Sequence, residues 1–305
     1  MTTLRKEAVH YIEDQQVATP YYQVTPQEAR AMRTVTPWQS PHKPTLAAMQ
    51  DQLITMRDGA QITLRLYIPT HDQPLPVIVY YHGGGWVYGN LESADAGCQL
   101  LADQAQAIVV SVDYRLAPEF SFPTPLQDAY DSLLWVHDHI EAFGGDAARL
   151  TVAGDSAGGN LATVVAYLAV TSGGPSLQAQ ALIYPVTNVD FTTVSYQAYG
   201  EKFGLDKQGM QWFSQHYTAE SNFTNPLVSP LLLEDVRHMP KTLLIAAEAD
   251  VLFDEGLSYA KKLTDAGVPV EHITMSGLIH SYFSKMNYFE EATIETVAKI
   301  AEFLK

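Results

Sequence analysis

Short apolar runs and amphipathic segments alternate along most of this 305-residue chain. Runs rich in Val, Ile, Leu and Tyr are typical of buried strands, whereas apolar residues spaced three and four apart are typical of one helix face. From about residue 62 to the end, the two kinds of segment follow one another in turn. This alternation predicts an α/β fold, with a mostly parallel central sheet flanked by helices.

The pattern places the predicted elements as follows. The strands lie at residues 62–68, 77–81, 108–112, 150–153, 179–184, 242–247 and 270–275. The helices lie at residues 94–104, 126–141, 157–170, 257–266 and 290–304. In the last helix, apolar residues share one face and predict a side that packs on the core.

Two segments interrupt the alternation, residues 1–50 and residues 188–224. The first contains Thr25-Pro26-Gln27-Glu28, a capping box with proline at the first helical position, which predicts a helix start. The second is rich in aromatic residues, among them Trp212 and Phe213. The chain is therefore expected to have a core made of residues 51–187 and 225–305, with two segments added to it.

Charge and cysteine content restrict which partners the protein is expected to have. The formal net charge is −16, from 34 Asp and Glu against 18 Lys and Arg. This charge disfavours nucleic acid and anionic membrane surfaces, so we expect neither as a partner. Cys98 has no second cysteine to pair with and is expected to be a small buried residue. The N-terminus lacks a signal-peptide pattern and the longest apolar stretch is too short to span a bilayer, so we expect a cytoplasmic protein.

The most informative motif is Gly154-Asp155-Ser156-Ala157-Gly158, which joins the strand at 150–153 to the helix at 157–170. A G-x-S-x-G sequence in this position is typical of a nucleophile elbow, a sharp turn that holds a serine hydroxyl above the edge of the sheet. Glycines suit such a turn because side chains at their positions would clash with nearby backbone. The alternative is an ordinary packing turn made of small residues.

A second motif, His82-Gly83-Gly84-Gly85-Trp86, follows the strand at 77–81. Acyl transfer from an ester passes through an oxyanion, which backbone N–H groups can stabilise. Gly83, Gly84 and Gly85 are therefore candidate donors, together with the N–H of Ala157 after the nucleophile. A phosphate-binding loop is the alternative, but the chain has neither G-x-x-x-x-G-K-[ST] nor G-x-G-x-x-G.

With these motifs, the chain resembles the hormone-sensitive-lipase-like family of α/β-hydrolases, in the branch that carries G-D-S-A-G. The resemblance covers roughly residues 75–285 and includes five further motifs: Asp113-Tyr114-Arg115-Leu116-Ala117-Pro118-Glu119, Tyr184-Pro185-Val186-Thr187, Ser229-Pro230-Leu231, Asp250-Val251-Leu252-Phe253-Asp254-Glu255-Gly256 and Gly277-Leu278-Ile279-His280. It implies an α/β-hydrolase fold in which the two added segments form a helical cap. It also implies hydrolysis of carboxylic esters by a Ser–His–Asp triad with no cofactor.

The base that activates Ser156 should be a histidine that follows it in the chain, because the family order is nucleophile, acid, histidine. Four histidines follow Ser156: His216, His238, His272 and His280. His280 is the candidate, since it comes just after the strand at 270–275, at the edge of the sheet where ligands bind. The others are expected in the second added segment, before a strand, or inside one.

The acid should follow the strand at 242–247, where four carboxylates lie: Glu248, Asp250, Asp254 and Glu255. The family motif selects Asp250, which would orient His280 and stabilise its charged form. Asp254 and Glu255 are expected in the first turn of the next helix, where carboxylates complement the helix dipole.

Several residues near the motifs are expected to support the site. Asp155 is expected to accept hydrogen bonds at the elbow, and His82 to anchor the glycine loop. Arg115 and Glu119 are expected to hold a loop through an ion pair. Trp86, Tyr88 and Trp212 are candidates for lining the substrate pocket, with plain packing as the alternative. No metal site is expected, because the chain has no H-E-x-x-H motif or cysteine cluster.

The sequence therefore predicts a serine carboxylesterase that acts on small, short-acyl esters, with a small-molecule ester as its partner. An amide, formamide or acetyl-sugar deacylase on the same triad is the alternative enzyme. A small-molecule receptor is the alternative outside enzymes, because plant gibberellin receptors resemble this family but lack the catalytic histidine. The presence of His280 favours an enzyme. The family resemblance also makes a homodimer plausible.

Overall fold

The computed structural model describes residues 2–15, 19–33 and 37–305. In this part of the chain the centre is an eight-stranded sheet with the order β1-β2-β4-β3-β5-β6-β7-β8. The strands are β1 (Ala48–Thr55), β2 (Gln61–Ile68), β3 (Leu75–Tyr81), β4 (Ile108–Val112), β5 (Gly145–Asp155), β6 (Leu177–Ile183), β7 (Lys241–Ala249) and β8 (Val270–Ile279). β2 runs antiparallel to both of its neighbours, and all other pairs are parallel. The expected mostly parallel sheet is confirmed.

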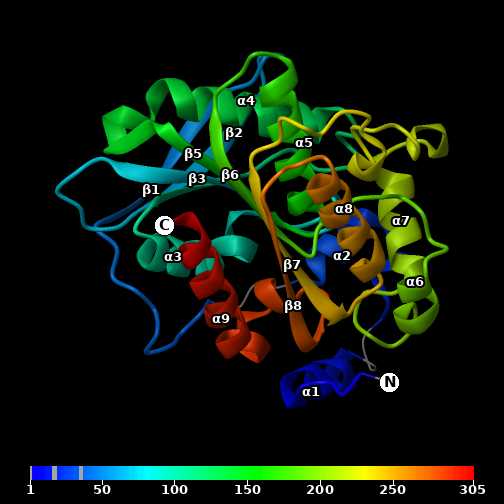
Figure 1. Cartoon of the computed structure of the whole chain (residues 1–305). Helices are drawn as coiled ribbons and strands as arrows, with labels where there is room; N and C mark the ends of the chain where they lie inside the picture. The colour runs from blue at the N-terminus through cyan, green and yellow to red at the C-terminus, as the bar shows by residue number, and fades with distance from the viewer. Residues whose placement is uncertain (1, 16–18, 34–36) are drawn as a thin grey trace.

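Helices cover both faces of this sheet (Figure 1). The helices that pack on the sheet are α3 (Leu91–Ala105), α4 (Thr124–His139), α5 (Ala157–Thr171), α8 (Phe253–Asp265) and α9 (Met286–Leu304). Side chains alternate between two cores along the central strands, so Val77 and Val79 pack with α4 and α5, whereas Ile78 and Tyr80 pack with α3 and α9. Burial on both sides explains why the central strands are nearly continuous apolar runs. Cys98, on α3, is buried as expected.

The seven predicted strands and five predicted helices are all present, with ends that differ by a few residues. β1 was not predicted, and it begins before the expected core boundary at residue 51. It is an edge strand whose side chains are largely exposed, including Met49 and Leu53. An edge strand of this kind has no continuous apolar run, so the pattern that identified the other strands is missing.

The two added segments are helical. The first contains α1 (Lys6–Gln15), the short 3-10 helix η1 (Tyr21–Gln23) and α2 (Pro26–Ala31), and the second contains α6 (Val194–Tyr199) and α7 (Lys207–Tyr217). α2 begins with the predicted capping box: Glu28 N–H donates to Thr25 Oγ1 at 3.3 Å, and Thr25 N–H donates to Glu28 Oε2 at 2.9 Å. The segments meet where η1 packs on α7, and the ring of Tyr21 stacks on that of Phe213 at 5.0 Å.

The N-terminal residues lie against the C-terminal part of the chain, as Figure 1 shows for α1 beside β8 and α9. Arg5 N–H donates to the carbonyl of Gly277 at 2.9 Å, and the Arg5 guanidinium is 3.3 Å from the Glu295 carboxylate. The ring of Tyr11 packs edge-on against Tyr288. None of the helices in the described ranges is long and apolar enough to cross a membrane.

Candidate active site

The carboxyl ends of the parallel strands bring the predicted residues to one edge of the sheet. His82 follows β3 and Ser156 follows β5, while Asp250 follows β7 and His280 follows β8. This edge is where open α/β sheets bind ligands. Residues that are far apart in sequence therefore meet because each comes directly after a neighbouring strand.

Ser156 lies on a strained turn between β5 and α5. Its φ is +56°, a conformation that costs a residue with a side chain about 1–3 kcal/mol. Ser156 N–H donates to the Ile183 carbonyl at 2.9 Å, which ties the turn to β6. The turn depends on Gly158, because a Cβ there would lie 1.9 Å from the carbonyl oxygen of Tyr81. The sharp turn expected from G-x-S-x-G is therefore present.

Ser156, His280 and Asp250 form one hydrogen-bonded series. Ser156 Oγ is 2.8 Å from His280 Nε2, and His280 Nδ1 is 2.6 Å from Asp250 Oδ2. The three residues are 7%, 4% and 2% exposed. Leu252 N–H donates to Asp250 Oδ1 at 3.0 Å, so the carboxylate is held from both sides. Because a carboxylate accepts, Nδ1 carries the proton and Nε2 is free to accept from the serine hydroxyl.

The other candidate acids have different partners. Glu248 accepts from Gly277 N–H at 2.8 Å, and Asp254 accepts from Ser195 N–H at 2.7 Å. Glu255 is only 1% exposed, and burial raises its pKa well above the ordinary value. Glu255 lies in the first turn of α8, as expected. It also accepts from the N–H groups of Thr187 and Asn188, so it binds the loop that follows β6. Asp250 alone among the four reaches His280 within the described residues.

In the glycine loop after β3, fewer backbone N–H groups are available to an oxyanion than the sequence suggested. Gly83 N–H donates to Asp155 Oδ1 at 2.8 Å, and the Tyr80 hydroxyl donates to the same oxygen at 2.8 Å. Asp155 is therefore the expected acceptor at the elbow, and Gly83 is not a free donor. The N–H groups of Gly84, Gly85 and Ala157 donate to no other group in the described part of the chain.

His82 anchors this loop. Its Nδ1–H donates to the Gly83 carbonyl at 2.7 Å, and its ring stacks on Tyr114 with centroids 4.3 Å apart. The Tyr114 hydroxyl in turn donates to the His82 carbonyl at 2.7 Å. Burial lowers the pKa of His82 to about 4, so the ring is neutral near pH 7. A neutral ring, held by the bond from Nδ1 and by stacking on Tyr114, positions the loop and transfers no proton.

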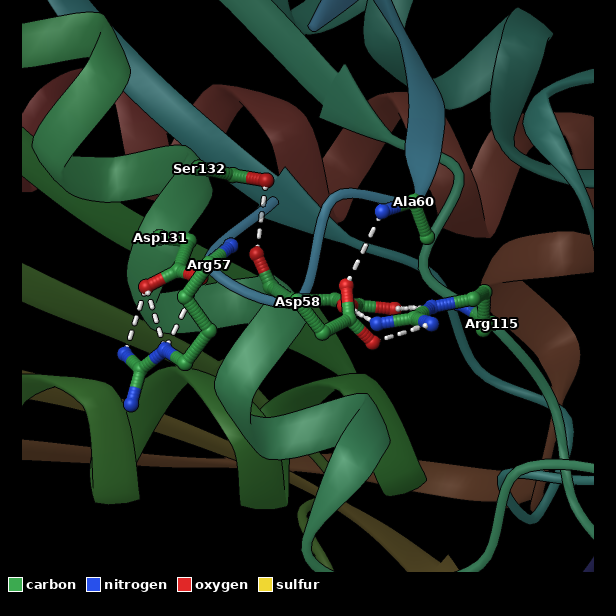
Figure 2. A network of polar contacts seen from close by, with 7 residues as sticks. Arg57, Asp58, Ala60, Arg115, Asp131 and Ser132 are labelled. Carbon is green, nitrogen blue, oxygen red and sulfur yellow. Dashed lines mark hydrogen bonds and ion pairs between the residues drawn. The ribbon is translucent and has the colours of Figure 1, made fainter. Parts of the chain in front are cut away.

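The segment that carries Tyr114 is fixed by ion pairs (Figure 2). Arg115 pairs with Asp128 at 2.6 Å and with Asp58 at 2.7 Å. The expected ion pair between Arg115 and Glu119 is wrong, because Glu119 pairs with Arg30 of α2 at 2.6 Å. The two side chains are close in sequence, but each one faces a different element.

Removal of the Arg115 charge is expected to destabilise the fold. The Asp128 side chain is completely buried, so Arg115→Met would leave its carboxylate without a compensating charge, at a cost of about 3–5 kcal/mol. Arg57 pairs with Asp131 at the surface nearby, as Figure 2 shows, and Arg57→Gln should cost about 1 kcal/mol or less. Urea unfolding of both variants measures the difference. Equal losses of stability would show that burial of Asp128 does not set the cost.

A cavity of about 1180 Å³ opens onto the hydrogen-bonded series. Ser156 and His280 line it, together with Tyr88 as expected. Trp86 does not: it is fully buried, and its ring stacks on Tyr217 at 4.2 Å. Trp212 is also absent from the lining.

Tyr21 and Phe213 line the cavity, although neither was among the pocket candidates chosen from the sequence. Phe213 lies next to Trp212 on α7, and neighbours on a helix point about 100° apart, so choosing the wrong one of the pair selects the wrong face. Phe213 packs directly on the glycine loop, because a Cβ on Gly85 would lie 2.2 Å from its ring. The spacing of residues along α7 is the sequence feature that could have identified Phe213. No group of three or more His, Cys, Asp or Glu side chains in the described ranges is arranged to hold a metal ion.

Comparison with known proteins gives consistent matches. A family model described as alpha/beta hydrolase fold matches residues 78–284. The ethyl acetate hydrolase of Pseudomonas putida is 39% identical over 262 residues, which cover 84% of this chain and 82% of the relative. The carboxylesterase NlhH of Mycobacterium tuberculosis is 41% identical over 232 residues, covering 74% and 72%. A fungal esterase structure from Rhizomucor miehei is 33% identical with a TM-score of 0.92, covering 100% of this chain and 96% of the other.

Proposed function

The chain belongs to the hormone-sensitive-lipase-like family of α/β-hydrolases, and from that premise we propose that it is a serine carboxylesterase for short-acyl esters. The observation that carries the proposal is the series Ser156–His280–Asp250, with hydrogen bonds of 2.8 and 2.6 Å. A hydroxyl is a weak nucleophile unless a base stands beside it, and this arrangement supplies one.

In the first half of the proposed reaction, Ser156 Oγ attacks the ester carbonyl carbon while its proton passes to His280 Nε2. Asp250 stabilises the resulting imidazolium without taking the proton. The N–H groups of Gly84, Gly85 and Ala157 would stabilise the negative charge on the carbonyl oxygen. The C–O bond then breaks, His280 returns the proton to the leaving alcohol, and the acyl group stays on Ser156.

In the second half, water attacks the acyl-enzyme and gives a proton to His280. The same backbone donors hold the second oxyanion. When the bond to Ser156 Oγ breaks, His280 returns the proton to the serine and the carboxylic acid leaves. No cofactor is needed, because each step moves only a proton and an acyl group.

The aromatic wall of the cavity supports a preference for short acyl chains. Phe213 contacts the glycine loop, and Tyr21 and Tyr88 pack on its ring at 5.0 and 5.1 Å. These rings occupy space beside the place where the carbonyl oxygen would bind. An acyl chain that extends toward them would have a limited length of apolar wall before it meets a ring.

We expect kcat/KM to rise by about fourfold per methylene from acetyl esters, to peak at a short chain, and then to fall, because a methylene contributes about 0.8 kcal/mol only while it can be buried. Phe213→Ala should move the peak to longer chains. Trp212→Ala, the neighbouring substitution outside the cavity lining, should leave the peak where it is.

A panel of p-nitrophenyl esters from acetate to palmitate measures this profile. A steady rise through palmitate, or a jump in rate above substrate solubility, would contradict the proposal and indicate a lipase. An unchanged peak in Phe213→Ala would show that this ring does not limit the acyl chain.

A further inference from the structure

Around the cavity, every carboxylate has a partner, whereas some of the cations have none in the described part of the chain. Three carboxylates line it, and each is engaged: Glu92 pairs with Arg65 at 2.8 Å, Asp95 accepts from the Tyr67 hydroxyl, and Asp155 accepts from Gly83 and Tyr80. Among the cations, Arg30 is paired with Glu119. Arg33, Lys285 and the exposed Lys43 also line the cavity, and none of them forms an ion pair with a described carboxylate. The residues outside the described ranges carry no carboxylate side chain, so none can supply the missing partner.

Arg33 is held by aromatic rings instead of by a carboxylate. Its guanidinium carbon lies 3.8 Å from the centroid of Tyr88 and 5.4 Å from that of Tyr21. Both rings belong to the aromatic wall beside the glycine loop. A cation stacked on rings keeps its charge and leaves the edge of the guanidinium to donate hydrogen bonds. This edge is suited to a carboxylate, which it can bind through two parallel hydrogen bonds.

Lys285 lies on the loop that carries His280. It comes directly after the short 3-10 helix η5 (Tyr282–Ser284) and before α9, so the backbone around it is fixed at both ends. Its side chain is partly buried and makes no hydrogen bond to a described group. Burial, together with the nearby charge of Arg33, lowers the pKa of Lys285 to about 8. The two cations therefore repel each other, and Asp155, the carboxylate whose charge offsets this at Lys285, is already engaged by Gly83 and Tyr80.

We propose that Arg33 and Lys285 select esters that carry a carboxylate in addition to the ester group, which deepens the proposed ester hydrolysis at Ser156 and rests on it. An anionic group bound near both cations would relieve their repulsion and give each of them a direct ion-pair partner. The net charge of −16 repels anions from the protein as a whole, but salt screens exposed charges beyond about 8–10 Å. Within a few ångströms of Arg33 and Lys285, these nearest charges dominate.

Two matched pairs of small esters test this proposal. Monoethyl succinate and ethyl levulinate have nearly the same shape, but only the first has a carboxylate, at the far end of its acyl part. Acetoxyacetate and acetoxyacetone make the same comparison on the alcohol side. Acid release under pH control gives kcat/KM for each ester, and the anionic-to-neutral ratio is the readout. Comparison of that ratio between wild type and variants removes differences in intrinsic reactivity.

Arg33→Gln and Lys285→Gln are each expected to lower the ratio by about tenfold in at least one pair, as loss of a charge-assisted hydrogen bond predicts. Arg33→Lys and Lys285→Arg, which keep the charge, should restore much of it. Lys43→Gln, which removes an exposed cation at the same cavity, is the matched control and should leave the ratio unchanged. Melting temperatures show whether each variant is folded.

The results separate this inference from the proposed function. If wild type hydrolyses the neutral esters but the ratio is the same in Arg33→Gln, Lys285→Gln and Lys43→Gln, carboxylate selection is wrong and ester hydrolysis stands. If wild type hydrolyses none of the four esters, the proposed function fails and this inference fails with it. A ratio that falls in the Arg33 and Lys285 variants alone supports both.

Discussion

Replacement of Ser156 by alanine is expected to lower kcat for a short ester by on the order of 10⁶-fold, because the only nucleophile of the proposed reaction is removed. His280→Ala should cost about the same, since Ser156 Oγ would lose the base that is 2.8 Å away. The double variant should be little worse than either single one, because members of a triad act as a unit. Initial rates with p-nitrophenyl acetate measure all three proteins.

The melting temperature is the control for this experiment. Ser156→Ala removes one hydroxyl and keeps the strained turn, so the fold should survive. A folded variant with near-wild-type turnover would mean that Ser156 is not the nucleophile. Slow turnover of every ester by wild type, together with tight binding of a small molecule, would instead favour a receptor.

Asp250→Asn is expected to lower kcat by about 10⁴-fold, the second largest effect that we predict. Asp250 accepts from Leu252 N–H with one oxygen and from His280 Nδ1–H with the other, whereas asparagine has a single acceptor oxygen, so its amide nitrogen would face His280 and favour the wrong tautomer. Asp254→Asn is the matched control on the same segment. Asp254 accepts from Ser195 N–H on α6, and its loss should cost about 1 kcal/mol of stability with little change in turnover.

Turnover and melting temperature of the two variants decide this assignment. If Asp254→Asn lost more turnover than Asp250→Asn, the acid of the series would be misidentified. If both lost turnover equally, the effect would come from displacement of α8 and its loop instead of from the hydrogen bond to His280.

Local sequence was enough to predict those parts of the site that depend on backbone turns. The elbow at Ser156 and the capping box at Thr25 are each marked by residues a few positions apart, although the elbow also bonds Ile183 and packs on Tyr81. The meeting of Ser156 with His280 could also be foreseen, because both residues follow strands of a parallel sheet.

The predictions that failed depend on packing between distant segments. Trp86 was a candidate for the pocket, but its partner Tyr217 lies in the second added segment, and no local pattern reveals that stacking. Arg115 and Glu119 have their partners on α4 and α2, which sequence spacing does not bring together. Charge and aromaticity show what a side chain can bind, whereas the fold decides which partner is within reach.

The contact of the first residues with the last helix has a consequence for synthesis. Arg5 and Glu295 are 290 positions apart, and ribosomes add about 5–20 residues per second, so on the order of 15–60 s separate their synthesis. Until the C-terminal residues are made, Ser156 exists without His280, and α1 has neither β8 nor α9 to pack on. The nascent chain therefore cannot hydrolyse an ester by the proposed mechanism, and its unpaired apolar surfaces are exposed to chaperones. Activity would arise only after His280 has been made and β8 has joined the sheet beside β7.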